Sequence, residues 1–376
     1  MNHARTIPHP AATAASRSGA LARYAIWIAL AATLLLLPYM FSSRLALSTM
    51  SLMGTMIIFA LSYNMLLGQT GLLSFGHAVF FGLGGFFTVH MLNMAGAGGW
   101  PVPLPLFPVV GALGGLFFGV LFGAVATKRA GTAFAMITLG IGELVVSSAL
   151  ILRRFFGGEE GITTDRTEVL QLFGYSFGPQ LQVYYLIAAW CLVSIAAMYA
   201  ITRTPFGRIC NAVRDNPQRT AFIGYDTGTV RFIAFSLSGL FAGIAGGLSA
   251  INFEIINAAQ MGAVESGAVI LMTYIGGVGN FAGPIIGAIL VTWLQLMLSD
   301  TTKVWPLYVG LLFIGMVMFA PGGIAGLVAM QAPLLAARRL HRVLPFYLLA
   351  LAPGVVAVVA LSVLIEPSPQ FSIRAA

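Results

Sequence analysis

A few polar side chains inside long apolar runs are the residues of this chain whose types and spacing could support chemistry. Ser74 and His77 are three positions apart, a spacing that a nucleophile and its base can have, although it is weak evidence alone. Glu143 and Glu265 are the acids that fall well inside apolar runs. Burying an ionised group in a membrane costs several kcal/mol, so these carboxyls should face the interior of a helix bundle.

Each of these residues also has a plainer interpretation. A single histidine at membrane depth, such as His77, can be a proton carrier or a ligand, but more often it hydrogen-bonds a neighbouring helix. Glu143 and Glu265 can line a path for a polar solute, or they can be structural or protonated carboxyls. Neither acid has a Lys or Arg partner inside the apolar runs. The sequence therefore argues against an ion-coupled carrier and leaves the roles of these residues open.

Two glycine-rich stretches predict broken helices at membrane depth. They are Gly68–Phe86 (GQTGLLSFGHAVFFGLGGF) and Tyr274–Ala288 (YIGGVGNFAGPIIGA). In transporters such interruptions often mark the translocation path, whereas small residues can also serve only close helix packing. The polar residues in and near these stretches favour the path. We therefore take as path candidates Gln69, Ser74, His77, Glu143, Glu265 and Asn280.

Several enzyme and cofactor signatures are missing from the sequence. It has no Gly-Lys-Ser/Thr phosphate loop, no His-Glu-x-x-His run and no Gly-x-Ser-x-Gly elbow. Its two cysteines suggest neither a disulfide framework nor a metal site. We expect a non-catalytic chain without a catalytic, metal or cofactor site, although an intramembrane hydrolase built on Ser74 and His77 is a weaker alternative.

The polar run from Arg203 to Asp226 interrupts the apolar sequence. Within it Phe206, Ile209 and Val213 recur at helical spacing, so a short helix would have one apolar and one cationic face. Proline disfavours the helical conformation in the residue before it, so Asn216-Pro217 should end this helix. Such a helix is a plausible docking surface for a soluble partner.

Composition places the chain in a membrane. Charged residues are 8% of the sequence and hydrophobic residues 59%, and the mean hydropathy is +0.92. The net charge of +8 does not indicate nucleic-acid binding, because the basic residues are scattered singly. We predict an all-α polytopic membrane protein with about 9–11 transmembrane helices. The candidate spans are 22–41, 45–67, 72–93, 105–126, 132–152, 181–201, 231–252, 262–279, 283–299, 305–328 and 344–365.

Alternating these spans from a cytoplasmic N-terminus places 13 of the 19 basic residues inside, including those of the run 203–229. The longest outside segment, 153–180, carries acids and glycines and should be a folded loop. We expect residues 1–20 to be a disordered cytoplasmic tail, 21–329 the membrane domain, and 330–376 an extra helix and tail.

Several segments, met in order, resemble one family. Gly68–Phe86 resembles the Gly-x-x-Ser-x-Gly-x-Ala-x-Phe block of branched-chain amino-acid ABC-transporter permeases of the LivM type. Phe134–Val146 is similar to the family's span with a central glutamate, here Glu143, and Gly157–Thr163 to its external glycine loop. Further similar blocks are TPFGRICNAVRDNPQRTAFIGYD, Leu237–Leu248, IGGVGNFAGPIIGA and Ala320–Leu327, so that the resemblance covers roughly 50–330.

The resemblance implies the permease subunit of an importer in the bacterial inner membrane. Its partners would be a second homologous permease, two cytoplasmic ATPases that hold ATP and Mg, and a periplasmic solute-binding protein. The residues that the resemblance places in the ATPase-coupling segment are Phe206, Arg208, Ile209, Val213, Arg214, Ala221 and Gly224. Those that it places near the binding protein are Gly157, Gly158, Glu159, Glu160 and Gly161.

The sequence leaves alternatives open for both the substrate and the energy source. Branched-chain amino acids are the expected solutes, but urea, short amides or aromatic acids could pass through permeases of similar sequence. A stand-alone secondary transporter or channel is the alternative mechanism. The cationic segment and the shortage of charge pairs in the apolar runs favour the ATP-driven importer.

Overall fold

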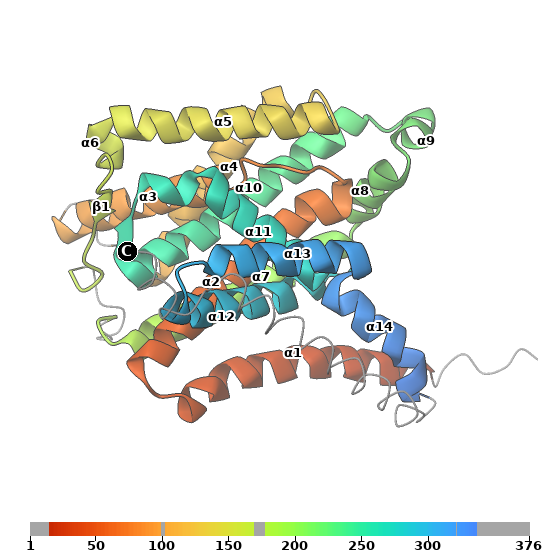
Figure 1. The fold of residues 1–376 in the computed structure, drawn as a ribbon, viewed down its shortest axis with the longest axis horizontal. Coiled ribbons are helices and arrows are strands. Elements are labelled where there is room, and N and C mark those ends of the chain that lie inside the picture. Colours follow the sequence, from red (N-terminus) through yellow and green to blue (C-terminus); the bar gives the residue numbers. More distant parts are fainter. Residues whose placement is uncertain (1–14, 99–101, 169–176, 321, 337–376) are drawn as a thin grey trace, which may run out of the picture.

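The computed structural model is a helical bundle, and it describes residues 15–98, 102–168, 177–320 and 322–336. Most helices run along one common direction, with α5 and α1 on opposite sides of the bundle (Figure 1). The helices are α1 Ala15–Met40, α2 Arg44–Thr70, α3 Ala78–Gly96, η1 Leu104–Leu106, α4 Phe107–Ala126, α5 Thr132–Ile151, α6 Arg153–Phe156, α7 Gln180–Arg203, α8 Pro205–Asp215, α9 Pro217–Phe222, α10 Thr227–Phe253, η2 Ala258–Met261, α11 Ala263–Gly276, α12 Gly283–Thr301, α13 Trp305–Phe319 and α14 Gly323–Ala336.

Seven of the described helices are long and apolar enough to cross a membrane: α2, α4 with η1, α3, α5, α7, α10 and α12. The bent pair α13 and α14 makes an eighth span if it is counted as one, and two shorter apolar helices are Trp27–Met40 and Ala263–Gly276. The all-α polytopic prediction is confirmed. The expected count of nine to eleven is reached only when the shorter helices are included.

Ten of the eleven predicted spans overlap helices of the structure, and the eleventh, 344–365, lies outside the described residues. Residues 1–14 of the expected N-terminal tail also lie outside them. Helix α1 begins at Ala15, so the helix includes the last six positions of that tail. Of the outside segment, residues 169–176 lie beyond the described part of the chain.

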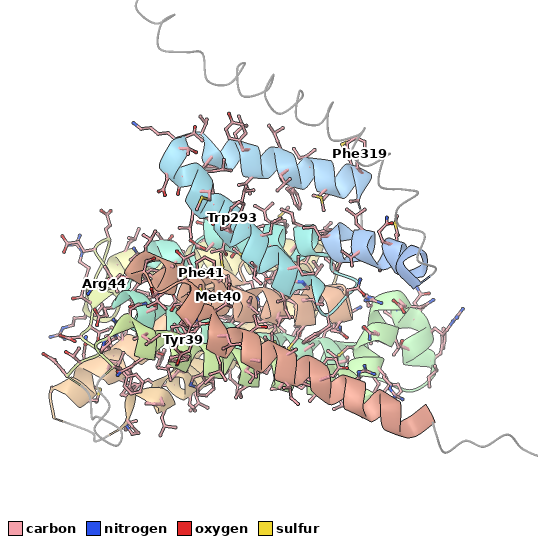
Figure 2. The ribbon with its side chains drawn as sticks, turned by 90° about the horizontal axis from the view of Figure 1, so that it is seen from below. Tyr39, Met40, Phe41, Arg44, Trp293 and Phe319 are labelled. Atoms are coloured by element: carbon pink, nitrogen blue, oxygen red, sulfur yellow. The ribbon has the colours of Figure 1, made fainter. Side chains whose placement is uncertain are left out.

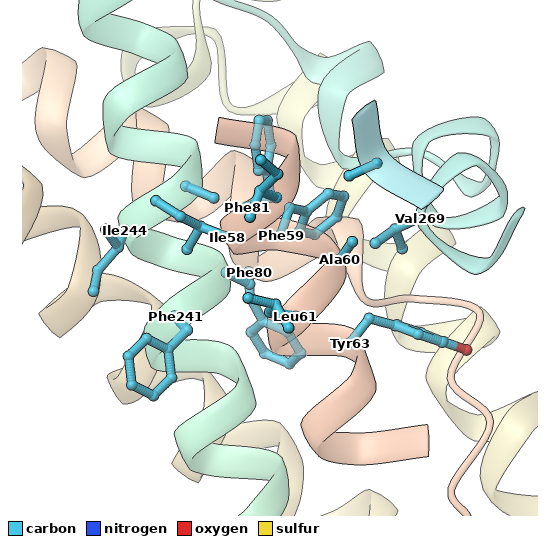
Figure 3. Packing of buried hydrophobic residues seen from close by; sticks show 14 of the residues in the cluster. Ile58, Phe59, Ala60, Leu61, Tyr63, Phe80, Phe81, Phe241, Ile244 and Val269 are labelled. Carbon is cyan, nitrogen blue, oxygen red and sulfur yellow. The ribbon is translucent and has the colours of Figure 1, made fainter. Parts of the chain in front are cut away.

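The core is formed by α2, α3, α4 and α10, and α10 packs most extensively against α4, α3 and α2. Figure 3 shows Ile58, Phe59 and Leu61 of α2 together with Phe80 and Phe81 of α3 beside α10. Lipid gives no hydrophobic drive between helices, so small residues must allow close packing. A Cβ on Gly243 of α10 would lie 2.1 Å from the carbonyl oxygen of Gly111 in α4, so a larger residue cannot fit there.

The outer surface is apolar, as expected for helices that face lipid. Leu113, Phe117 and Leu121 of α4 are exposed on one side. Figure 2 shows Tyr39, Met40 and Phe41 at the turn between α1 and α2, close to Arg44. Tyrosine and arginine side chains at helix ends are typical anchors at the membrane–water boundary. The α1–α2 turn therefore lies at the membrane–water boundary.

The bundle has two ends with different elements. At one end lie α8 and α9, which follow the C-terminus of α7 and precede α10 (Figure 1). At the other end lie α6 and a two-residue antiparallel pair, β1 (Ile162–Thr163) with β2 (Ile255–Ile256), after the C-terminus of α10. The predicted coupling segment and the predicted external loop thus occupy opposite ends of the bundle.

Candidate functional site

The first glycine-rich stretch contains a helix break. Helix α2 ends at Gly71, whose φ of 71° is left-handed, and α3 starts only at Ala78. Between them the chain is held from both sides. The Tyr63 hydroxyl donates to the Ser74 carbonyl oxygen at 3.0 Å and accepts from the Ser74 N–H at 3.2 Å. A Cβ at Gly76 would lie 2.0 Å from the Thr138 carbonyl oxygen of α5. The break is therefore a piece of non-helical backbone that is held on both sides.

The end of the same stretch serves packing instead. Gly84 lies inside α3, where a Cβ would come within 2.5 Å of the Gly243 Cα. The stretch from 68 to 86 therefore combines the two interpretations of its glycines: residues 71–77 break the helix, and the later glycines let α3 approach α10.

His77 is fully buried at the N-terminal end of α3. Its Nε2 lies 3.0 Å from the Ser62 Oγ of α2, and its ring stacks on Phe59 with centroids 5.5 Å apart. The Ser62 hydroxyl donates its one hydrogen to the Phe59 carbonyl oxygen, so the imidazole donates from Nε2 to Ser62. His77 thus joins α2 to α3 across the break.

The pair of Ser74 and His77 does not form a nucleophile and base here. Ser74 Oγ and His77 Nδ1 are buried and have no hydrogen-bond partner within the described part of the chain. The histidine bonds Ser62 rather than Ser74. The arrangement gives no support to an intramembrane hydrolase.

The second glycine-rich stretch is also broken, between α11 and α12. Gly277, at φ 115°, ends α11, and Asn280 is exposed in the connection before Gly283. The two breaks meet at the C-terminal end of α2. A Cβ on Gly68 would lie 2.9 Å from the Val278 carbonyl oxygen. Next to Gly68, the Gln69 Oε1 is buried without a partner among the described residues.

The two acids differ in their surroundings. Glu143 is exposed on α5. Glu265, in the first turn of α11, lines a cavity of about 240 Å³ between α2, α10, α11 and α12. Of the six path candidates, the structure places Gln69, Ser74, His77 and Asn280 at the two breaks, Glu265 in this cavity, and Glu143 away from both.

The polar run 203–226 folds as predicted into a short helix, α8, that ends at Asn216. The Thr204 side chain caps its start, and the Asn216 side chain then accepts from the Arg219 N–H at 2.9 Å to begin α9. The apolar face is not free. Cys210 and Val213 are buried against α10, with Phe206 and Ile209 packed beside them.

The exposed apolar surface of this segment lies elsewhere. Phe222 is 92% exposed, Ile223 72% and Tyr225 47%. The segment Phe206–Tyr225 that the resemblance implies for ATPase docking contains these three residues. Sequence analysis singled out only their neighbours Ala221 and Gly224, because the pattern is too short to show a face. We call Phe222, Ile223 and Tyr225 the exposed tip. Arg208 is exposed as well, whereas Arg214 turns to the bundle and donates to the Gly68 carbonyl oxygen.

The external loop candidates lie in a constrained turn. Gly157, Gly158 and Gly161 all have positive φ, and Glu159 and Glu160 are exposed between them. A Cβ on Gly161 would lie 2.1 Å from the Ile256 carbonyl oxygen of β2. The loop therefore presents two carboxylates on a backbone that is fixed to the end of α10.

Arg166, which sequence analysis did not single out, fastens this loop. Its guanidinium donates to the carbonyl oxygens of Ile251 and Asn252 at the C-terminus of α10, at 3.2 and 3.1 Å. It also donates to the carbonyl oxygens of Phe177 and Gly178, and it lies 3.6 Å from the Glu254 carboxylate. The long sequence separation of these partners hides the cluster from pattern analysis.

The sequence is similar to known proteins over most of its length. Residues 45–321 match a family described as "Branched-chain amino acid transport system / permease component". The chain is similar to the high-affinity branched-chain amino acid transport system permease protein LivM of Salmonella typhimurium and to that of Escherichia coli. Each is 26% identical over 299 residues, which is 74% of this chain and 69% of the relative.

Other relatives are named for the import of other solutes. The fructose import permease protein FrcC of Rhizobium meliloti is 27% identical over 224 residues, 56% of this chain and 61% of that protein. The autoinducer 2 import system permease protein LsrC of Yersinia pestis is 29% identical over 223 residues, 56% of this chain and 59% of that protein. No solved structure matches the chain.

Proposed function

Because the chain belongs to the family of branched-chain amino acid transport system permease components, we propose that it is the membrane-spanning subunit of an ATP-driven importer of branched-chain amino acids. It carries no ATP-hydrolysing site in its sequence, so ATP and Mg would be held by two cytoplasmic ATPase subunits. A second homologous permease and a periplasmic solute-binding protein complete the proposed assembly. The membrane is the bacterial inner membrane, with the N-terminus in the cytoplasm.

The observation that carries the proposal is the placement of α8. This helix contacts α9, which leads into the exposed tip, and it contacts the C-terminal end of α2, where the two helix breaks meet. A force applied to the segment from outside the bundle would therefore reach Gly68 and the breaks directly. In transporters, broken helices commonly form the substrate site, and access changes as parts of the bundle rock around that site. A stand-alone carrier has no need of such a contact.

The exposed tip supports a soluble partner at this end. A large aromatic residue that is 92% exposed, beside an isoleucine that is 72% exposed, is costly in water and typical of an anchor that a partner covers. Arg219, an exposed cation of α9 three residues before Phe222, would orient an acidic groove. We assign the tip to the ATPase subunits.

The identity of the transported solute is a more specific part of the proposal than the importer mechanism. Relatives in this comparison are named for branched-chain amino acids, fructose and autoinducer 2, so membership of the family does not fix the solute. The LivM proteins align over 299 residues, against 224 and 223 for the sugar and autoinducer permeases. The greater coverage favours amino acids.

Reconstitution tests the proposed function. The chain would be co-expressed with its permease, ATPase and binding-protein partners and placed in vesicles with the binding protein outside. We expect leucine uptake that requires ATP and Mg²⁺ on the ATPase side and stops when the ATPase subunits are omitted. Accumulation of leucine by the chain alone, without nucleotide, would overturn the proposal.

A further inference from the structure

The cavity beside Glu265 lies toward the end of the bundle that carries β1 and β2. Its walls include Leu52 from the first half of α2, Ser249 from the last part of α10, and Gln260 of η2, four residues after β2 ends. The 240 Å³ cavity is somewhat smaller than the roughly 300–1,000 Å³ typical of sites for drug-sized ligands. It therefore suits a small solute, and it lies at the end of the bundle that carries the predicted external loop.

Three polar side chains of this cavity, from Gln260, Glu265 and Thr292, are available to a ligand. Glu265 makes no ion pair within the described chain, and no Lys or Arg is among the lining residues. The Gln260 Oε1 and the Thr292 Oγ1 are buried and lack hydrogen-bond partners among the described residues. Buried polar atoms are nearly always satisfied, so two unpaired oxygens on η2 and α12, beside the unpaired Glu265 carboxyl of α11, indicate a missing ligand.

The chemistry of these groups selects a cation. All three oxygens can accept a hydrogen bond, and Glu265 adds a negative charge. A primary ammonium group has three N–H donors and one positive charge, which matches this set. Three aromatic side chains, Phe81, Phe253 and Trp305, also line the cavity, and aromatic faces attract cations. A carboxylate or a phosphate would instead meet repulsion from Glu265.

Most of the remaining lining residues are apolar. Met56, Met272 and Leu296 form walls that a branched aliphatic side chain can contact without leaving a polar atom unpaired. The amide N–H groups of Gln260 and Gln295 remain as donors for a second polar group of the solute. A neutral sugar would leave the charge of Glu265 without a counterion.

We propose that this cavity is a binding site for the ammonium group of an aliphatic amino acid, with Glu265 as the counterion. The inference rests on the proposed function, because it names the solute class that the importer carries. It adds that the membrane subunit itself selects solutes that carry an amine, so that selection is not made by the binding protein alone.

The test is ligand binding to the assembled complex in lipid nanodiscs, without nucleotide and without the binding protein. Tryptophan fluorescence reports occupancy because Trp305 lines the cavity, and Trp305→Phe identifies its share of the signal. The probes are leucine, 3-methylbutylamine and 4-methylpentanoate, which share the aliphatic chain but differ in the amine. We expect saturable binding of leucine and the amine, and at least tenfold weaker binding of 4-methylpentanoate.

Variants separate the local contact from a general charge effect. Glu265→Gln should weaken binding of leucine and 3-methylbutylamine at least tenfold, and Glu265→Asp should weaken it less. Asp300→Asn is the matched control, because this exposed carboxylate lies one residue after the lining residue Ser299 but outside the cavity. It should leave binding unchanged.

Two results would overturn the inference: equal affinity for 3-methylbutylamine and 4-methylpentanoate in the unmodified complex, or full binding by Glu265→Gln. The comparison of the two ligands needs no variant, so it tests the inference even if the complex with Glu265→Gln does not assemble. ATP-dependent uptake with no effect of Glu265 would refute this site while leaving the importer proposal intact. Amine binding without ATP-dependent uptake would refute the importer and leave the site.

Discussion

The Arg214 guanidinium, on α8, donates a hydrogen bond to the Gly68 carbonyl oxygen in the last turn of α2. The side chain also covers Gly71, where a Cβ would lie 3.1 Å from the Arg214 Cγ. A cation at a helix C-terminus stabilises the unpaired carbonyls by about 0.3–1 kcal/mol. This contact is the shortest described connection between the segment 203–226 and the two helix breaks.

Arg214→Ala should uncouple ATP hydrolysis from transport. The variant keeps the exposed tip, so the ATPase subunits should still co-purify and hydrolyse ATP, but motion of α8 would no longer reach Gly68. We expect leucine uptake per ATP to fall at least tenfold. Arg208→Ala, which removes an exposed arginine of the same helix, is the control. If Arg214→Ala keeps the normal ratio of transport to hydrolysis, the contact has no role in coupling.

Phe222→Asp combined with Ile223→Asp should abolish association with the ATPase subunits. Both side chains are exposed in the isolated chain, so the change should not unfold the subunit. Truncation of a buried interface anchor costs about 2 kcal/mol or more, which is at least thirtyfold in affinity.

Co-purification of the ATPase subunits measures this effect. Gln218→Asp adds negative charge to the same segment without removing an apolar side chain, so it controls for charge alone. ATPase recovery at the normal level with the double variant would place the docking surface elsewhere.

The sequence predicted the positions of the helices better than it predicted which of their side chains are exposed and which are buried. Apolar run length located ten spans, and the spacing of Phe206, Ile209 and Val213 located α8, because both signals are local. The same spacing could not tell that this apolar face packs on α10, since that depends on residues more than a dozen positions away.

Long-range contacts explain the other differences. Arg208 and Arg214 are equivalent in the sequence and both are exposed, but Arg214 also bonds a carbonyl 146 positions away. The sequence likewise leaves open whether His77 is a proton carrier, a ligand or a structural residue. The fold shows that it hydrogen-bonds Ser62. Glycine content indicated both breaks, yet only the packed backbone shows that they meet at Gly68 and Val278.

The start of α10 should fray as the pH falls. The Asp226 carboxylate accepts from the Gly228 N–H at 2.9 Å and from the Thr229 hydroxyl at 2.6 Å. These bonds, that to Thr229 first, hold the pKa of Asp226 below its ordinary value of 3.8. Because the pKa is lower in the folded state, the stabilisation is complete above pH 3.8 and is lost as the pH falls through the folded-state pKa.

Hydrogen exchange of the amides in the first turn of α10 measures this loss. After correction for intrinsic exchange, protection should decrease below about pH 4 in the unmodified chain. Asparagine is also a good N-cap and does not titrate, so Asp226→Asn should show protection independent of pH. Parallel pH profiles for the two proteins would contradict the prediction.

Arg166 and Glu254 form an ion pair, but their replacement should have unequal effects. The Arg166 side chain is 9% exposed and donates to carbonyl groups of four residues, whereas the Glu254 side chain is 38% exposed. Arg166→Ala would leave buried carbonyls without donors, and we expect a loss of about 3–5 kcal/mol. Glu254→Gln should cost less than about 1 kcal/mol, because a half-exposed ion pair contributes little.

Thermal unfolding of the purified chain in detergent tests this difference, with the lower melting temperature expected for Arg166→Ala. Arg166→Lys keeps the charge but loses the planar fork that reaches several carbonyls, so its melting temperature should fall between those of Arg166→Ala and the unmodified chain. If Glu254→Gln and Arg166→Ala are equally destabilised, the ion pair rather than the carbonyl contacts holds the external loop to α10.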